Sequence, residues 1–199
     1  MFAWDSRKRK RCKIFPAYKK KRIIEKSEDD IVLDKIAYPQ FSTLRRIILP
    51  EIGFKNNFIC TGYEGDDIIA KVVLDDGFLF CPECDIIIVT RDSDMWQLIS
   101  DRVSIFDPQT KKMKTLKSFK KEYGIEPYQW AEVKAIGGCK GDEVPGVKGV
   151  AVGYAIQYLK GTLNDKGKLY GRIVSNPKLI ARNRQLVKLP FSGIKLPDI

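Results

Sequence analysis

Residues 87–99, IIVTRDSDMWQLI, join an apolar run to two acids and then to a second apolar pattern. The continuous run over residues 85–90 is typical of a strand that is buried on both faces of a parallel sheet. Asp92 and Asp94 follow it directly, and residues 95–100 predict a helix. The segment therefore predicts a strand, an acidic turn and a helix, which is the repeating unit of an α/β fold.

The same alternation extends outward from this segment. Further strands are expected at residues 2–4, 58–60 and 103–106, and a helix with one apolar face at 64–73. Later helices are expected at residues 117–123, 127–136, 151–160 and 177–186. We therefore expect an α/β region over residues 1–110, followed by a helical region over residues 111–199.

Charge is divided unevenly along the 199 residues, whose net charge is +11. Residues 1–22 hold ten lysines and arginines against one acid, residues 23–101 hold seven against sixteen, and residues 102–199 hold nineteen against eight. Basic surfaces that flank an acidic region suit a protein that binds a polyanion and holds cations. A general charge excess that keeps the protein in solution is the alternative.

Composition excludes several classes of site. The chain has no histidine, which removes histidine-based acid–base and triad chemistry. Its five cysteines are an odd number for a disulfide framework, and Cys81 with Cys84 is expected to form a reduced turn before a strand. No apolar run approaches the roughly 18–20 residues that cross a bilayer, and no signal peptide is evident, so we expect a soluble, cytoplasmic protein with no membrane partner.

Acidic side chains follow three of the expected strands. They are Asp5, then Glu64, Asp66 and Asp67, then Asp92 and Asp94. Because the carboxyl ends of parallel strands share one edge of an open sheet, we expect these six carboxylates to converge. Clustered carboxylates repel one another unless a cation lies between them, and oxygen-only ligands select Mg²⁺ or Mn²⁺ rather than zinc. Two such ions can activate water against a phosphodiester, so the cluster favours phosphodiester hydrolysis.

Helix capping is the alternative for each acidic cluster taken alone. Asp92 or Asp94 could cap the helix at residues 95–100, and the three acids at 64–67 could favour the start of theirs. Because three strand ends in one chain all carry acids, we prefer a shared cation site.

A glycine-rich segment, GGCKGDEVPGVKGV, spans residues 137–150 between two expected helices. Glycines let backbone N–H groups face an anion, and the helix that begins at Ala151 adds the positive end of its dipole. Lys140 and Lys148 add two charges. The segment predicts a grip on a nucleic-acid backbone that does not read bases. An ordinary turn between helices is the alternative.

Five segments, in order along nearly the whole chain, resemble the flap endonuclease/5′–3′ exonuclease family, which includes phage 5′ exonucleases and the 5′-nuclease domain of bacterial DNA polymerase I. They are FAWDSRKRKRCKIFPAYKKKR (2–22), GYEGDDIIA (62–70), IIVTRDSDMWQLI (87–99), KAIGGCKGDEVPGVKGVAVGYAIQYL (134–159) and RNRQLVKLP (182–190). The second is similar to the family's GxEADD helix, the third to its TxDxDxxQL segment, and the fourth to its helix–three-turn–helix.

The resemblance implies a PIN-like α/β fold, a parallel sheet with helices, followed by a helical DNA-binding region with a helix–three-turn–helix at about residues 128–160. It implies that DNA is cut near 5′ ends, flaps or forks with two Mg²⁺ (or Mn²⁺) ions, and that a K⁺ ion lies on the carbonyls of the hairpin. The implied metal ligands or nearby acids are Asp5, Glu64, Asp66, Asp67, Asp92, Asp94 and Asp142.

The resemblance also implies roles for basic residues. Lys19 and Arg22 would act with Asp92 in catalysis by contacting the scissile phosphate, and a solvated basic face is the alternative for both. The implied DNA contacts are Arg7, Arg9, Lys13, Lys140, Gly146, Lys148 and Gly149. Tyr18 could belong to the core or stack on a base.

Two features depart from the family pattern. Cys139 stands where the family has the first aspartate of GDxSDN, and Asp142 matches the second, so one metal position loses an acid. The strand at residues 2–4 corresponds to one that the family reaches only after a central strand with an Asp-Gly pair and several helices. We expect its absence to leave an unpaired, apolar sheet edge. A complementary N-terminal polypeptide that fills this edge and a truncated or misassigned start are the two favoured explanations, and a smaller sheet is the alternative.

The sequence as a whole predicts a metal-dependent, structure-selective 5′ nuclease of a bacterial or phage-infected cell, with roles in DNA replication and repair. The alternative is a catalytically impaired protein that still binds branched or forked DNA. A PIN-type ribonuclease is a third interpretation, and an RNA–DNA hybrid is a further candidate substrate.

Overall fold

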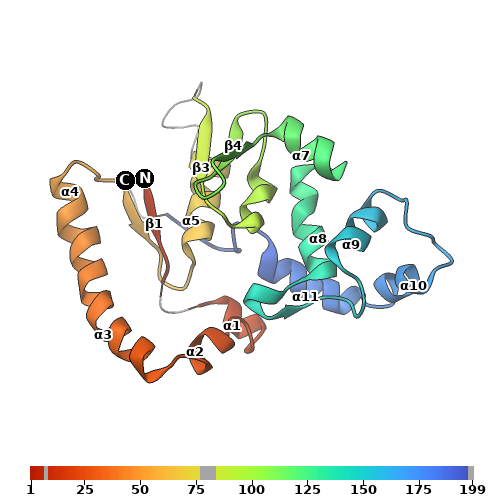
Figure 1. Ribbon diagram of the computed structural model, residues 1–199, viewed down its shortest axis with the longest axis horizontal. Helices are drawn as coiled ribbons and strands as arrows, with labels where there is room; N and C mark the ends of the chain where they lie inside the picture. Colours follow the sequence, from red (N-terminus) through yellow and green to blue (C-terminus); the bar gives the residue numbers. More distant parts are fainter. Residues whose placement is uncertain (7–8, 77–83, 197–199) are drawn as a thin grey trace.

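Parallel strands and helices alternate along the first half of the chain, as expected for an α/β protein (Figure 1). The computed structural model describes residues 1–6, 9–76 and 84–196. The strands are β1 (Phe2–Trp4), β2 (Asn57–Ile59), β3 (Ile86–Val89), β4 (Val103–Asp107), β5 (Lys112–Lys114), β6 (Gly138–Cys139) and β7 (Val144–Pro145).

Helices cover these strands and make up most of the second half. The α-helices are α1 (Arg11–Ile14), α2 (Lys21–Ile24), α3 (Glu28–Thr43), α4 (Leu49–Glu51), α5 (Gly65–Lys71), α7 (Leu116–Tyr123), α8 (Trp130–Gly137), α9 (Val152–Leu159), α10 (Lys168–Val174) and α11 (Pro177–Val187). The remaining helical turns are η1 (Leu44–Ile48), η2 (Val72–Asp76), η3 (Ser93–Leu98), η4 (Pro127–Gln129) and η5 (Lys140–Asp142).

The parallel sheet is divided into two parts. β1 pairs with β2, and Ala3 lies opposite Phe58, whereas β3 pairs with β4, and Ile88 lies opposite Ile105. β5 extends the second part in the antiparallel direction. Within the described residues no strand ladder joins β1 to β3, although Figure 1 shows both pointing the same way. Each part therefore has an edge that no described strand pairs.

The main hydrophobic core lies under β3 and β4 and continues through the helices of the second half. Trp96, Phe119, Tyr123 and Trp130 form its aromatic centre, with ring centroids 4.9 Å apart for Trp96 and Trp130 and 4.9 Å for Phe119 and Tyr123. Such offset and edge contacts add to the free energy gained by burying the rings. The core crosses residue 110, so the division into regions 1–110 and 111–199 stays a prediction.

The helix–turn–helix expected near residues 128–160 is formed by α8, the β6–β7 hairpin and α9. Asn183 of α11 is fully buried and donates from Nδ2 to the carbonyl oxygens of Ala135 at 2.9 Å and Pro145 at 2.7 Å. Because a buried amide must satisfy its donors, this side chain fixes α11 against both α8 and the hairpin.

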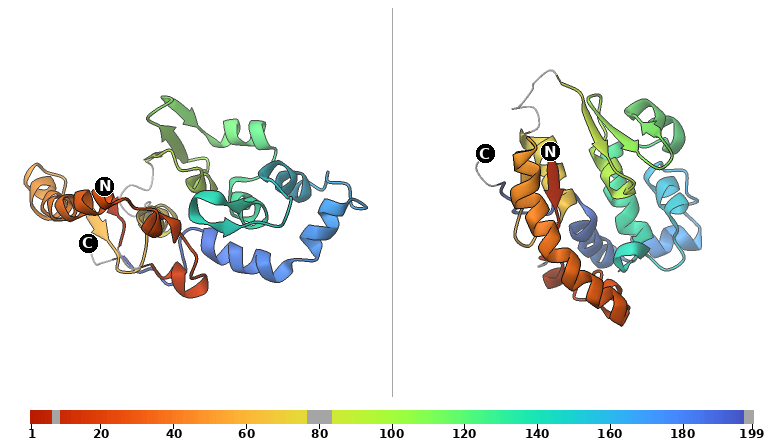
Figure 2. Two further views of the ribbon diagram at one scale, coloured as in Figure 1. Left: turned by 60° about the horizontal axis from the view of Figure 1, so that its bottom comes forward. Right: turned by 60° about the vertical axis from the view of Figure 1, so that its left-hand side comes forward.

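Helix α3 stands apart from the rest of the molecule and forms an arm that Figure 2 shows from two further sides. It starts at Ser27, whose hydroxyl accepts from the backbone N–H of Asp30. None of its sixteen residues is buried. Several of its apolar side chains, Val32, Leu33 and Ile36, are more than half exposed. Trp4 and Phe41, with ring centroids 6.4 Å apart, link it to β1.

Several expectations about the fold are wrong. The strand near residues 85–90 is not buried on both faces, because Ile87 is 56% and Val89 63% exposed and nothing in the described part of the chain covers that face. Cys84 is disulfide-bonded rather than reduced, and Cys81 lies outside the described residues. β5 and α10 were not expected.

No described helix combines the length and the apolar character that crossing a membrane requires.

Candidate metal and nucleic-acid site

Acids that follow β1, β2 and β3 meet near the start of α5. Asp5 lies just after β1, and its Oδ1 accepts from the backbone N–H of Gly65 at 2.7 Å. Asp66, in the first turn of α5, has a pKa raised to about 7, first by burial and then by the charges of Asp92, Asp5 and Glu64. Charges that shift one another in this way lie close together. Asp5, Glu64 and Asp92 are thus close enough for their charges to act on Asp66, but among the described residues these strand-end acids do not form a group with ligand atoms within 4.8 Å of one another. Their convergence on one cation stays a prediction.

Asp92 also caps a helix, as the alternative interpretation proposed. Asp92 is the N-cap of η3, and its Oδ1 accepts from the backbone N–H of Asp94 at 2.8 Å. Its remaining oxygen and its exposure leave Asp92 able to contact a cation or a substrate. Capping and cation binding are thus compatible at this residue.

Glu64 is the acid most surrounded by basic groups. It is 6% exposed, and its Oε1 lies 2.8 Å from Lys19 Nζ and 3.8 Å from Arg9 Nε. The Tyr18 hydroxyl donates to its Oε2 at 3.0 Å. Tyr18 is 3% exposed, which places it in the core rather than on a base-stacking surface.

Lys19 joins the strand-end acids to the hairpin. Its φ of 52° turns the chain sharply, and its backbone N–H donates to the carbonyl of Asp142 at 3.1 Å. Asp142 Oδ1 lies 3.5 Å from Lys19 Nζ and 3.0 Å from Arg22 Nη2. Arg22 also donates to the carbonyl of Gly141 and is more than half exposed. Lys19 and Arg22 therefore lie beside acids on the hairpin side of the cluster.

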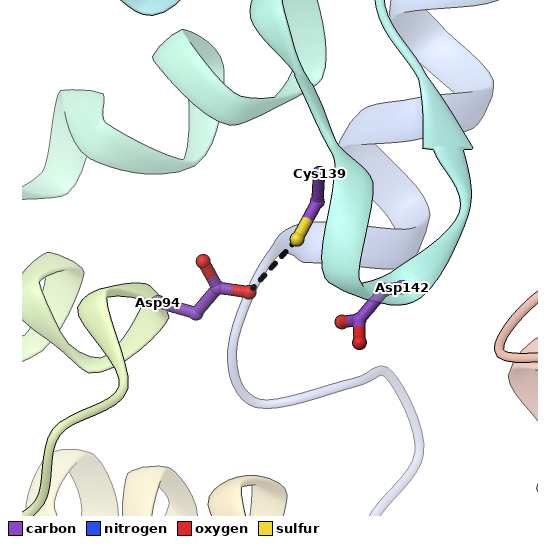
Figure 3. Close-up of side chains that lie close together, drawn as sticks. All are labelled: Asp94, Cys139 and Asp142. Carbon is purple, nitrogen blue, oxygen red and sulfur yellow. Dashed lines mark hydrogen bonds between the residues drawn. The ribbon is translucent and has the colours of Figure 1, made fainter. Parts of the chain in front are cut away.

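A second group of possible ligands lies between η3 and the hairpin (Figure 3). Asp94, Cys139 and Asp142 each place one ligand atom within 4.8 Å of the others. Lys134 Nζ lies 2.7 Å from Asp94 Oδ1 and bonds to Ser93 Oγ at 2.9 Å. Burial raises the pKa of Asp94, and the ammonium of Lys134 acts in the opposite direction.

Asp67 occupies a different environment from the other acids. It is fully buried, and Arg11 binds both its oxygens, at 2.6 and 2.7 Å. The backbone N–H groups of Glu64 and Phe191 donate to the same carboxylate at 3.0 and 2.8 Å. These bonds use its accepting capacity, so a ligand role for Asp67, which stays a prediction, is not favoured by this geometry.

The expected DNA contacts of the hairpin divide into two kinds. Lys140 and Lys148 are exposed and available to a phosphate backbone. Gly146 lies against Gly137, where a Cβ would come within 2.3 Å of backbone atoms. Gly149 has a φ of 81°, and Arg172 Nη1 would lie 2.7 Å from a Cβ there. The glycines therefore permit close packing of the hairpin.

The remaining predicted DNA contacts lie outside the hairpin. Lys13 is exposed on α1, Arg9 faces Glu64, and Arg7 lies outside the described residues. Sequence reasoning missed Arg11, Lys134 and Asn183. The partners of these three residues, Asp67, Asp94 and Ala135, lie 56, 40 and 48 residues away along the chain. No local sequence pattern indicates contacts over such separations.

The donor set fits divalent cations. Carboxylates dominate it, and oxygen ligands suit Mg²⁺ and Mn²⁺. A cation beside Asp66 and Asp92 would relieve the repulsion that raises the pKa of Asp66. Asp5, Asp66 and Asp92 are candidates to hold one ion. Asp94, Cys139 and Asp142 are candidates to hold a second.

Comparison with known proteins agrees with this geometry. Residues 1–124 match the family model described as 5′-3′ exonuclease, N-terminal resolvase-like domain. A 5′-3′ exonuclease of Bacillus subtilis is 32% identical over 151 residues, which cover 74% of this chain and 47% of that protein. The chain thus spans about half the length of this curated relative.

Solved structures are similar over 94% of this chain. The T5 D15 protein co-crystallised with metal ions has a TM-score of 0.78 at 26% identity, over 74% of its own length. The bacteriophage T5 D15 flap endonuclease in a pseudo-enzyme–product complex with DNA and metal ions has a TM-score of 0.77 at 23% identity, over 72% of its length. The predicted α/β fold with a helical region is confirmed. The chain belongs to the 5′-3′ exonuclease family, whose N-terminal resolvase-like domain its residues 1–124 match.

Proposed function

We propose that this chain supplies the metal-binding and DNA-binding parts of a structure-selective 5′ nuclease that hydrolyses DNA phosphodiesters with two Mg²⁺ or Mn²⁺ ions. The observation that carries the proposal is the meeting of acids from separate strand ends with Lys19 and Arg22. Membership of the 5′-3′ exonuclease family and the likeness to a T5 flap endonuclease solved with DNA and metal ions support it.

The bound ions would polarise a water and stabilise the leaving oxygen of the phosphodiester. The chain's own residues place the reacting phosphate. Lys19 is held by Glu64 and Asp142, and Arg22 by Asp142 and the Gly141 carbonyl. The Arg22 side chain is 55% exposed, so it is the better placed of the two to bind phosphate oxygens as charge builds up on them, whereas the Lys19 side chain is 9% exposed and lies among the acids. Asp92 lies on the exposed side of the cluster, where a substrate would approach.

The path of the DNA backbone is proposed to cross the hairpin. An open pocket of about 490 Å³ lies between α2 and η5, and its lining includes Lys21, Arg22, Lys26 and Lys140. Lys148 lies further along the same hairpin, where Arg172 bonds to its carbonyl at 3.1 Å. Exposed lysines on a rigid support neutralise phosphates without reading sequence. The expected K⁺ ion on the hairpin carbonyls stays a proposal of the same kind.

We also propose that a complementary N-terminal polypeptide completes the sheet between β1 and β3. Both parts of the sheet have an unpaired edge, and Ile87 and Val89 of β3 are exposed. A pocket of about 520 Å³ between β1 and α3 is lined mainly by Trp4, Tyr38, Phe41 and Ile59. Trp4 Nε1 is buried there without a hydrogen-bond partner among the described residues. A parallel strand followed by an apolar helix would pair both edges and cover these surfaces.

Mixing this chain with the part of the Bacillus subtilis relative that lies outside their match tests the second proposal. We expect a one-to-one complex in sedimentation. The double variant Ile87→Lys/Val89→Lys should abolish it, because two charges would be buried in the interface. Val174→Lys, on an exposed residue of α10, is the matched control. If the double variant binds as well as the control, the docking face is wrong.

The nuclease proposal is tested on a 5′-flap DNA with Mg²⁺ or Mn²⁺, with EDTA as the metal-free control. The chain and its complement should cut the flap and leave a 5′-phosphate. Asp66→Asn should lower the rate by about 10²-fold or more, whereas the exposed Asp101→Asn should not. Forked DNA that is bound tightly but never cut, with either metal, would instead support a catalytically impaired binding protein.

Substrate class is decided by a parallel measurement. A flap in which the cut strand is RNA in an RNA–DNA hybrid should be compared with the all-DNA flap under the same conditions. Preference for RNA would favour a ribonuclease. The cytoplasm of a bacterial or phage-infected cell is the proposed location, because DNA intermediates of replication and repair are found there.

A further inference from the structure

Cys139 lies where β6 ends, on the side of the hairpin that faces η3, and Figure 3 shows its sulfur directed at Asp94. The Sγ atom lies 3.9 Å from Asp94 Oδ2. One ligand atom from each of Cys139, Asp94 and Asp142 lies within 4.8 Å of the other two. An ion with metal–ligand distances of about 2.0–2.3 Å could contact all three after small side-chain movements.

We propose that Cys139 is a sulfur ligand of the cation position formed with Asp94 and Asp142, and that this position prefers a thiophilic ion such as Zn²⁺ to Mg²⁺. The inference rests on the proposed function, because it concerns the same cation cluster. Mg²⁺ requires oxygen ligands in octahedral geometry, whereas a thiolate selects Zn²⁺ and related ions. The resemblance to the family places an aspartate at this residue, so the cysteine changes the class of ligand.

The contacts of Cys139 place its sulfur beside the Asp94 carboxylate. The Cys139 thiol donates to Asp94 Oδ2. A divalent ion would take the place of that proton between sulfur and carboxylate. Lys134 holds Asp94 from the other side through its Oδ1, at 2.7 Å, and so keeps Oδ2 directed at the sulfur.

A purely structural role for Cys139 is the competing explanation, since its side chain is half-buried and packs against the main core. The two roles differ in what removal of the sulfur does. Loss of a packing group lowers stability and leaves metal preference unchanged. Loss of a ligand changes the order of preference among metals.

The test is metal binding by the full chain, measured without DNA. Cd²⁺ should produce the ultraviolet charge-transfer band of a metal–thiolate bond, which should saturate at one ion per chain. Cys139→Ser should abolish the band and weaken Zn²⁺ binding in calorimetry by roughly tenfold or more, because even outer-shell changes at metal sites cost about 10–100-fold. Cys139→Asp should also lose the band, and it should bind Mg²⁺ more tightly than the natural chain.

Cys12→Ser is the matched control, because Cys12 is a free, partly buried cysteine whose sulfur donates to the carbonyl oxygen of Tyr18. It should keep the band. Should Cys139→Ser destabilise the fold, Cys139→Asp carries the test, since its Mg²⁺ and Zn²⁺ affinities are compared in one variant. A band that survives in folded Cys139→Ser or Cys139→Asp overturns the inference, even if the chain cuts DNA. A band that depends on Cys139, in a chain that cuts nothing, leaves the inference standing while the nuclease proposal fails.

Discussion

Helices α8 and α3 show how differently the two halves of this molecule are built. Five of the eight residues of α8 are buried, and its neighbours α9 and α11 complete the enclosure. None of the sixteen residues of α3 is buried, although the helix carries several large apolar side chains, among them Val32, Leu33 and Ile36. In the described residues, the half that holds the hairpin encloses its core. The half that holds β1, β3 and α3 leaves apolar side chains exposed on β3 and α3.

This difference indicates how the two proposed activities are distributed. Lys140 and Lys148 belong to the enclosed half, are exposed, and are already placed where they could bind a phosphate backbone. The acids around Asp66 lie at the border with the open half, where the sheet is divided. Binding of DNA should therefore depend less on a complementary polypeptide than cutting does.

The largest expected effect separates the two halves directly. Phe119→Ala removes the centre of the aromatic cluster and should lower the free energy of unfolding by about 3–5 kcal/mol. Ile36→Ala on α3 removes a side chain that is 55% exposed and should change it by less than about 0.5 kcal/mol. Urea unfolding of both variants measures the contrast. Similar losses in both would mean that α3 is packed in solution.

A smaller effect concerns two arginines that bind carboxylates through two nitrogens. Arg11 is 3% exposed and joins Asp67 to the carbonyl of Leu186, so it ties the acidic border to α11. Arg11→Met should cost about 3 kcal/mol, because it leaves a buried carboxylate without its cation. Arg184 pairs with Glu132 in a similar way at the surface, so Arg184→Met should cost about 1 kcal/mol or less. Equal costs would contradict the structural role given to Asp67.

The pH dependence of stability should be reversed from that of an ordinary acidic cluster. The pKa of Asp66 is about 7 in the fold and 3.8 in its ordinary state, so between these values the folded chain holds more protons than the unfolded chain. The free energy of unfolding of the metal-free protein should therefore fall as pH rises from about 4 to about 7, and then level off. Asp94, whose pKa is also raised, acts in the same direction.

Thermal unfolding at about pH 5 and about pH 8 in EDTA measures this effect. Asp66→Asn should flatten the difference, since an amide does not titrate. Saturating Mn²⁺ should do the same in the natural chain, because a cation favours the ionised carboxylate. A metal-free chain that is more stable at the higher pH would contradict the crowding of acids around Asp66.

The smallest expected effect is confined to α3. Ser27→Ala removes the hydroxyl of the capping box with Asp30, which should cost about 1 kcal/mol of local helix stability. Because α3 packs so little, we expect faster amide exchange along α3 and almost no change in global unfolding. A global loss of the same size would show that the arm is coupled to the rest of the fold.

Local patterns predicted strands β1 to β4, most of the later helices and the placing of acids directly after the strands, because neighbouring residues determine where strands end and helices begin. They failed where the outcome depends on partners far along the chain. Ile87 and Val89 have the composition of a buried strand, and only the absence of a covering element in the described part of the chain exposes them. In sequence, Asp67 resembles the neighbouring Asp66, but the two hydrogen bonds from Arg11 to its carboxylate give it a structural role.

The basic run at residues 9–22 illustrates the same limit. Its members look alike in sequence, but Arg11 and Lys19 are buried against acids while Lys13 and Lys20 are exposed. Lys134 and Asn183 carry no signal at all, since a lysine in a helix and an asparagine near its end are usually solvated. Such residues are recognised only after the fold has brought their partners to them.

Diffraction from crystals soaked in Mn²⁺, recorded at a wavelength where manganese scatters anomalously, tests the central claim most directly. We expect an anomalous peak within bonding distance of Asp66 and Asp92, and its disappearance in Asp66→Asn crystals. Crystals that bind manganese only at scattered surface acids, with nothing between these two carboxylates, would contradict the account.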